Sequence, residues 1–158
     1  MKIRVAESRD AAAAAKLISL AYRVEDFFKI GDRTDEADVL ARMKKGVFLL
    51  LEDDEDALAG CVYVATRQDT GYFGMLSIDP ARQGQGLGSK LIKAAEHYCR
   101  ERGCQTMELE VVNLRTELPP FYARFGYAAS GTRPFPDSEF AKLPCHFIVM
   151  SKPLQPRA

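Results

Sequence analysis

The sequence lacks an excess of either charge, since 22 lysine and arginine residues are balanced by 22 aspartate and glutamate residues. It therefore lacks the positive field that draws nucleic acid or an anionic membrane surface, and we expect neither as a partner. It also lacks an apolar run close to the roughly 20 residues that a membrane-spanning helix needs. The first ten residues, MKIRVAESRD, contain no apolar segment typical of a secretory signal. We expect a cytoplasmic protein.

Cysteine is sparse and follows no ligand pattern. The four cysteines are Cys61, Cys99, Cys104 and Cys145; they form no C-x-x-C pair and have no histidine at the spacing of a zinc site. The simplest interpretation is that all four are reduced thiols. We therefore predict no metal site and no disulfide framework.

The 158 residues suffice for one domain and no repeat or linker divides them, so we predict a single domain over residues 1–158. Helical spacing of apolar residues predicts helices over residues 11–22, 35–45, 87–102 and 118–126. Alternating or short apolar runs between turn residues predict strands over residues 2–7, 47–53, 58–67, 72–79, 106–112, 126–131 and 145–152.

The order of these elements indicates how the sheet is connected. Short polar turns separate the three strands between residues 47 and 79, which is typical of an antiparallel meander. The third of these strands is joined to the strand over residues 106–112 through a helix, and such a crossover within one sheet joins parallel strands. The sequence therefore predicts a mixed α/β domain of the α+β kind.

The segment RQGQGLGSKL, residues 82–91, lies between the strand and the helix of this crossover. Such a loop lies at the carboxyl end of the strand, where open α/β sheets bind ligands. Gly84, Gly86 and Gly88 leave the backbone bare beside the helix N-terminus, whose unpaired N–H groups and positive dipole end favour an anion. We infer a cradle for a phosphate or pyrophosphate.

Two nucleotide-binding motifs fit this loop poorly. A P-loop needs G-x-x-x-x-G-K-[ST], but here Ser89 precedes Lys90, and three residues separate Gly84 from Gly88. A dinucleotide fingerprint needs G-x-G-x-x-G, and here Gly88 comes one residue early. A domain that binds ATP or NAD is therefore a disfavoured alternative.

Two segments together resemble a known family. LSIDPARQGQGLGSKLI, residues 76–92, resembles the acetyl-CoA signature of the GCN5-related N-acetyltransferases (GNAT), whose loop is [QR]-x-x-G-x-[GA]. LEVVNLRTELPPFYARFGY, residues 109–127, resembles their second signature. The resemblance covers essentially the whole chain and implies a central mixed, mostly antiparallel sheet of about six to seven strands, with one parallel β-α-β pair and helices on both faces. It also implies acetyl-CoA as cosubstrate and direct transfer of its acetyl group to a primary amine.

The resemblance assigns a cofactor site residue by residue. Backbone groups of a strand would contact the pantetheine arm of CoA and the loop would hold the pyrophosphate. The residues concerned are Leu76, Ser77 and Ile78 on the strand and Gln83, Gly84, Gln85, Gly86, Leu87, Gly88 and Ser89 in the loop. Asn113 is a further expected CoA contact, although it stands nine residues before Tyr122, two more than the common family spacing.

The resemblance also implies the catalytic groups. Tyr122 matches the general acid that protonates the departing CoA thiolate. Attack on the thioester needs a neutral amine, so a base must accept a proton, and Glu110, twelve residues before Tyr122, is the best candidate. Glu108 shares the strand face of Glu110 and is the first alternative, and a water chain is the second. The glutamate that the family usually carries on the third meander strand is missing, and that strand offers Ser77 instead.

Family members build the acceptor pocket from the loop between the first two helices and from the last hairpin. In this sequence these segments offer Arg23, Phe27, Phe28, Arg33, Arg133, Phe135 and His146. Aromatic rings with arginines suit an amine with an apolar body or a carboxylate.

A small-molecule amine is favoured as the acceptor because the neutral charge balance indicates no acidic groove for basic protein tails. Acetylation of a protein or peptide is the alternative within the same activity. A CoA-binding regulatory module without turnover is the alternative of another class, motivated by the missing glutamate and the shifted Asn113. Analogy with the family also allows a homodimer.

Overall fold

The computed structural model describes residues 1–136 and 138–154. Within these ranges the strands are β1 (Lys2–Val5), β2 (Gly46–Glu52), β3 (Leu58–Arg67), β4 (Thr70–Ile78), β5 (Thr106–Val112), β6 (Ala128–Pro134) and β7 (His146–Pro153). The α-helices are α1 (Ala11–Ala21), α2 (Glu36–Arg42), α3 (Leu87–Glu101) and α4 (Leu118–Ala123). Short 3-10 turns are η1 (Ser8–Asp10), η2 (Tyr22–Glu25), η3 (Pro80–Arg82) and η4 (Ser138–Phe140).

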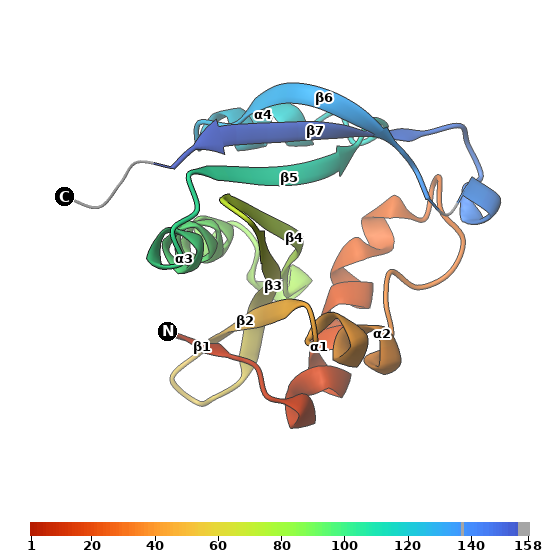
Figure 1. Cartoon of the computed structure of the whole chain (residues 1–158). Coiled ribbons are helices and arrows are strands. Elements are labelled where there is room, and N and C mark those ends of the chain that lie inside the picture. The colour runs from red at the N-terminus through yellow and green to blue at the C-terminus, as the bar shows by residue number, and fades with distance from the viewer. Residues whose placement is uncertain (137, 155–158) are drawn as a thin grey trace.

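These strands form one sheet in the order β1-β2-β3-β4-β5-β7-β6 (Figure 1). Neighbouring strands are antiparallel except β4 and β5, which are parallel and are connected through α3. The predicted fold class is confirmed, including the mostly antiparallel sheet and its one parallel β-α-β pair.

Helices cover both faces of the sheet, and the sequence of β2 shows why. Phe48 and Leu50 pack with α1 and α2 on one face, whereas Leu49 and Leu51 pack with α3 on the other. A strand buried on both faces reads as a continuous apolar run rather than as an alternating one. Figure 1 shows α1 and α2 on the opposite side of the central strands from α3. No helix in the described ranges is long and apolar enough to cross a membrane.

The parallel strands β4 and β5 diverge toward their carboxyl ends. Their pairing runs from Thr70 with Thr106 to Tyr72 with Glu108 and stops there. Beyond this point β4 continues to pair with β3, and β5 continues to pair with β7. The two halves of the sheet therefore separate where the strands lead into the glycine loop and α4, and this opening positions the site.

A β-bulge in β4 lies at the opening. Between the pairs of Tyr63 with Gly74 and Cys61 with Ser77, two residues of β4 face one residue of β3. Met75, within the bulge, has a φ of 54°, which is uncommon for a residue other than glycine. The bulge interrupts the ladder next to the opening and changes the direction of the β4 backbone there.

Candidate active site

The loop before α3 leaves backbone donors open to solvent. Gly84 and Gly86 have φ values of 84° and 74°, the left-handed region that glycine adopts without strain. Gly86 is the N-cap of α3, and no side chain caps this helix end. A Cβ built at Gly84, Gly86 or Gly88 would meet no other group within 4 Å. The first N–H groups of this 15-residue helix therefore have no capping side chain, and the loop beside them leaves room for a phosphate.

A groove of about 690 Å³ runs from this loop into the opening between β4 and β5. It is lined by Ala21, Tyr22, Val24, Leu76, Ile78, Arg82, Gln83, Gly84, Gly86, Leu87, Gly88, Ser89, Arg115, Glu117, Leu118, Phe121, Tyr122, Arg124 and Phe125. The groove thus brings together most of the residues that the sequence predicts for the cofactor, with Tyr122 beside them. Ser77, Gln85 and Asn113 are not among its lining residues.

Arg82 links the loop to the turn between β2 and β3. Its guanidinium donates a hydrogen bond to the Asp53 carboxylate across 2.5 Å. This hydrogen bond is the main reason that the pKa of Asp53 lies below its ordinary value. The ion pair ties the start of the glycine loop to the neighbouring turn.

Ser77 and Asn113 have structural contacts. The Ser77 hydroxyl donates to the backbone oxygen of Met75 at 2.9 Å, inside the bulge, and the residue is 1% exposed. The Asn113 side-chain oxygen accepts from the backbone N–H of His146 at 2.8 Å, and the Asn113 N–H donates to the His146 oxygen. Asn113 thereby joins the end of β5 to the start of β7, away from the groove.

Arg115 lines the groove in a position that the sequence analysis did not select. It stands seven residues before Tyr122, the spacing at which the family pattern has its asparagine. The family spacing could therefore have indicated this position. Its guanidinium contacts the carboxylates of Glu117 and Glu25, both at 3.0 Å. The pair with Glu25 is largely buried, with side chains 15% and 8% exposed.

Tyr122 lies in α4 at the opening. It is 7% exposed, and its ring packs edge-on against Phe73 of β4, with 6.0 Å between ring centroids. Its hydroxyl makes no hydrogen bond to another residue in the described ranges. Burial raises the pKa of Tyr122 well above that of a free phenol, so the hydroxyl keeps its proton at neutral pH.

A second cavity, of about 200 Å³, is also lined by Tyr122, and we call it the acceptor cavity after the role that we propose for it. It is lined by Tyr22, Glu25, Lys29, Arg33, Arg42, Tyr72, Gly74, Met75, Glu110, Val111, Val112, Leu118, Tyr122, Phe135, Pro136 and Phe147. Tyr22, Leu118 and Tyr122 line both this cavity and the groove. The two cavities therefore adjoin at these three residues.

The two glutamates of β5 differ in their surroundings. Glu110 lines the acceptor cavity, accepts a hydrogen bond from the Tyr72 hydroxyl at 3.4 Å and lies 3.6 Å from Arg133. Glu108 does not line the cavity, and its carboxylate accepts from Arg133 at 2.6 Å. Of the two, only Glu110 is in a position to contact a molecule in the acceptor cavity.

The other predicted acceptor residues are dispersed. Arg33 and Phe135 line the acceptor cavity, whereas Phe28 is fully buried and Phe27 is 54% exposed. His146 is exposed and lines neither cavity. Among the residues that the structure describes, no group of histidine, cysteine, aspartate or glutamate side chains is arranged to hold a metal ion.

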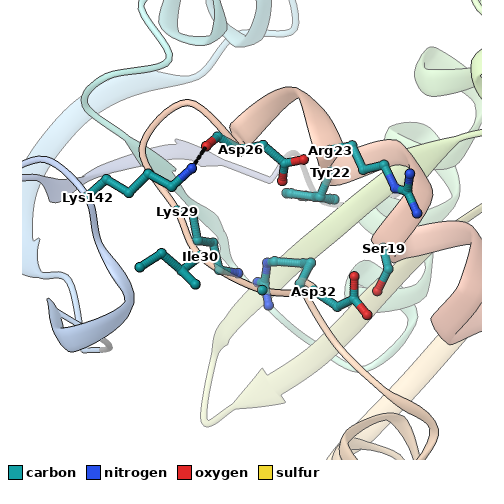
Figure 2. Close-up of a pocket in the computed structure, with 10 residues that line it drawn as sticks. Ser19, Tyr22, Arg23, Asp26, Lys29, Ile30, Asp32 and Lys142 are labelled. Atoms are coloured by element: carbon teal, nitrogen blue, oxygen red, sulfur yellow. Dashed lines mark hydrogen bonds between the residues drawn. The ribbon is translucent and has the colours of Figure 1, made fainter.

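A further pocket of about 310 Å³ opens at the surface next to the acceptor cavity, and Arg23 lines this outer pocket instead. Figure 2 shows it between the end of α1, the loop after η2 and the segment that carries Lys142. Tyr22, Lys29 and Arg33 line both the outer pocket and the acceptor cavity. The acceptor cavity therefore adjoins a surface pocket that is lined mainly by charged and polar residues.

Comparison with known proteins identifies relatives of this chain. Acetyltransferase Atu2258 of Agrobacterium fabrum is 28% identical over 92 residues, which are 56% of this chain and 64% of that protein. Mycothiol acetyltransferase of Rhodococcus erythropolis is 35% identical over 89 residues, which are 52% of this chain and 30% of that protein. The chain therefore spans less than two thirds of the length of either relative.

A solved structure and a family model also match this chain, and both are of acetyltransferases. The structure of yncA from Salmonella typhimurium with its cofactor acetyl-CoA matches with a TM-score of 0.74 at 21% identity, covering 100% of this chain and 96% of that one. The model of the Acetyltransferase (GNAT) family matches residues 14–127, which is more than half of the chain. With the glycine loop, the diverging parallel strands and both sequence signatures in place, this chain belongs to the GNAT family of acetyltransferases.

Proposed function

We propose that this protein is an acetyl-CoA-dependent N-acetyltransferase that transfers acetyl directly to a primary amine on a small molecule. The observation that carries the proposal is that Tyr122 lines both the groove and the acceptor cavity. A cofactor in one and an amine in the other would meet at this side chain. Direct transfer in a ternary complex needs such proximity, because holding both reactants together removes the entropic cost of their encounter.

The groove supports CoA as the cofactor in two ways. Its loop offers N–H groups and a positive helix end to the pyrophosphate. Its strand wall, with Leu76 and Ile78, has no partner from β5, so backbone groups of β4 are available to the amide-bearing pantetheine arm. The structural neighbour yncA contains acetyl-CoA, which is consistent with this assignment.

In the proposed reaction the amine nitrogen forms a bond to the acetyl carbonyl carbon, and the carbon–sulfur bond of the thioester breaks. Tyr122 donates its proton to the departing thiolate. Burial raises the pKa of this phenol. Burial also raises the pKa of a thiol, as the buried Cys61 shows, whose pKa is raised to about 12. A thiolate released beside Tyr122 is therefore also a stronger base, so the proton transfer stays feasible.

Glu110 is the proposed acceptor of the proton that the amine loses, directly or through a water molecule. Its carboxylate lines the acceptor cavity together with Tyr122, whereas that of Glu108 does not. The Glu110 carboxylate also lies 3.6 Å from the Arg133 guanidinium. The positions of the two glutamates therefore support Glu110 over Glu108.

The size of the acceptor cavity, about 200 Å³, supports a small acceptor rather than a protein segment. One relative is named after a small molecule, mycothiol, which agrees with this choice.

The test has two stages. We expect acetyl-CoA, and neither ATP nor NAD, to raise the unfolding midpoint by several degrees at about a hundredfold excess over Kd. We then expect release of CoA thiol when small amines are added. Binding without thiol release from any small amine or peptide would support the CoA-binding regulatory module instead. A midpoint raised by ATP or NAD alone would contradict the assignment of the groove.

A further inference from the structure

The charged side chains around the acceptor cavity differ in the ion pairs that they form within the protein. The cavity is lined by three cationic residues, Lys29, Arg33 and Arg42, and by two anionic residues, Glu25 and Glu110. A charge that folding removes from water is stabilised by an opposite charge, so the partners of each group matter for what the cavity binds.

Both glutamates already have an arginine from outside the lining set. Glu25 is 3.0 Å from Arg115, and Glu110 is 3.6 Å from Arg133. Arg42 is likewise paired, because its guanidinium lies 3.1 Å from the Asp38 carboxylate. None of these three charges requires a partner from a bound molecule.

Arg33 differs from them. In the described ranges it has no carboxylate within the 4.0 Å of an ion pair, and its guanidinium lies 5.3 Å from the centroid of the Tyr22 ring. The nearby Asp38 carboxylate accepts hydrogen bonds from the Thr34 hydroxyl and from Arg42, which lower the pKa of Asp38 against the effect of its burial, and the charge of Arg33 adds a smaller contribution. Arg33 is half-buried and presents its donors beside Tyr22, which lines both the groove and the acceptor cavity.

The segment that carries Arg33 is anchored on both sides. The Ser19 hydroxyl donates to the backbone oxygen of Thr34 at 2.9 Å. On the other side the N–H of Ile30 donates to the oxygen of Phe140 at 2.8 Å, and Lys142 Nζ donates to the oxygen of Asp26 at 2.8 Å, the dashed line in Figure 2. The backbone on either side of Arg33 is therefore held in place before any ligand binds, which lowers the entropic cost of binding.

We propose that the acceptor is an amine that also carries a carboxylate, and that Arg33 binds this carboxylate. A guanidinium offers paired donors that match a carboxylate, and such charge-assisted pairs are among the stronger hydrogen bonds. The rings of Tyr22, Phe135 and Phe147 line the same cavity and contact the apolar part of the molecule. An α-amino acid or a similar small amino carboxylate has these features. The inference rests on the proposed function.

The experiment compares matched amines. The wild-type protein is assayed for CoA thiol release with the standard α-amino acids, with their carboxamides, and with amines that have no acid group. We expect kcat/KM to be higher for a free carboxylate than for its carboxamide. Arg33→Gln should lower kcat/KM for the carboxylate by about ten- to a hundredfold and leave the carboxamide within about threefold, because only the carboxylate loses a charged partner. Arg33→Lys should recover part of the difference, since the charge remains and the paired donors do not.

Arg67→Gln is the matched control, because it removes the same charge from an exposed position that lines neither cavity. It should keep the wild-type ratio between carboxylate and carboxamide. Acetylation confined to amines without an acid group, or an unchanged ratio in Arg33→Gln, would overturn the inference and leave the proposed function standing. Absence of thiol release with every amine would overturn both.

Discussion

The groove and the acceptor cavity share Tyr122 but are built from different parts of the polypeptide. The end of the groove that we propose to bind the pyrophosphate is formed by backbone: a short glycine-rich loop and an uncapped helix end, contiguous in sequence. The acceptor cavity is lined by charged, aromatic and apolar side chains from η2, the loop after it, α2, β4, β5, α4, β7 and the segment before η4. A backbone site depends on a local motif, whereas a side-chain site depends on how distant segments pack.

This difference has a chemical meaning. Backbone N–H groups recognise a phosphate by geometry and dipole, independently of which side chains surround them. Side chains recognise what distinguishes one amine from another, such as a carboxylate beside Arg33. Substitutions should therefore separate the two regions, and the expected effects are given below from the largest to the smallest.

The largest effect is expected where the two regions meet. Tyr122→Phe removes the proposed proton donor and retains the ring that packs on Phe73. We expect kcat to fall roughly ten- to a thousandfold, with acetyl-CoA affinity within about threefold. Steady-state kinetics and ligand-induced shifts of the unfolding midpoint measure the two quantities. Tyr98→Phe in α3, which lines neither cavity, is the control, and an unchanged kcat would remove Tyr122 from the mechanism.

The next effect concerns the ion pair that connects the regions, since Arg115 lines the groove and Glu25 lines the acceptor cavity. Arg115→Met leaves the buried Glu25 carboxylate without this partner, so we expect the free energy of unfolding to fall by about 3 kcal/mol. The double variant Glu25→Gln with Arg115→Met should recover part of that loss, because no charge is left buried. Urea unfolding measures both, and equal stabilities of the single and double variants would contradict the prediction.

A smaller effect tests the groove alone. Gly88→Asp places a carboxylate in the first turn of α3, where a Cβ meets no neighbouring group within 4 Å. The helix dipole stabilises a negative charge at this position, so the free energy of unfolding should not fall. The same charge should repel the pyrophosphate of acetyl-CoA, and we expect the KM for acetyl-CoA to rise about tenfold. Gly88→Ala adds the Cβ without the charge and should lose less affinity. Equal losses in the two variants would mean that steric exclusion, and not charge, governs this end of the groove.

The smallest effect is a pH dependence of stability at the boundary of both cavities. Burial raises the pKa of Tyr22 to about 12. Because the folded state favours the protonated phenol, this stabilisation is complete below pH 10 and is lost as the pH rises toward 12. Tyr22→Phe cannot ionise at this position, so its unfolding midpoint should fall less steeply than that of the wild type between pH 10 and 11.5. Parallel slopes would contradict the assignment of this dependence to Tyr22.

The residues of the groove could be predicted from the sequence better than those of the acceptor cavity, and particular residues explain why. Gly84, Gly86 and Gly88 sit together in one loop, so their common role could be read locally. Arg33 and Phe135 come from segments about a hundred residues apart, and nothing in their order distinguishes them from Phe27, which is exposed. Asn113 matched the family pattern only approximately, and in the structure its side chain joins β5 to β7.

By itself, the sequence determined the strand and helix pattern, the parallel crossover and the glycine loop, because each follows from local periodicity or from the backbone freedom of glycine. Only the tertiary structure decided that Tyr122 lies between two cavities and that Glu110, rather than Glu108, faces one of them. It also decided which charges are paired. Pairing depends on distances of a few ångströms between segments far apart in the chain, and these are set by packing.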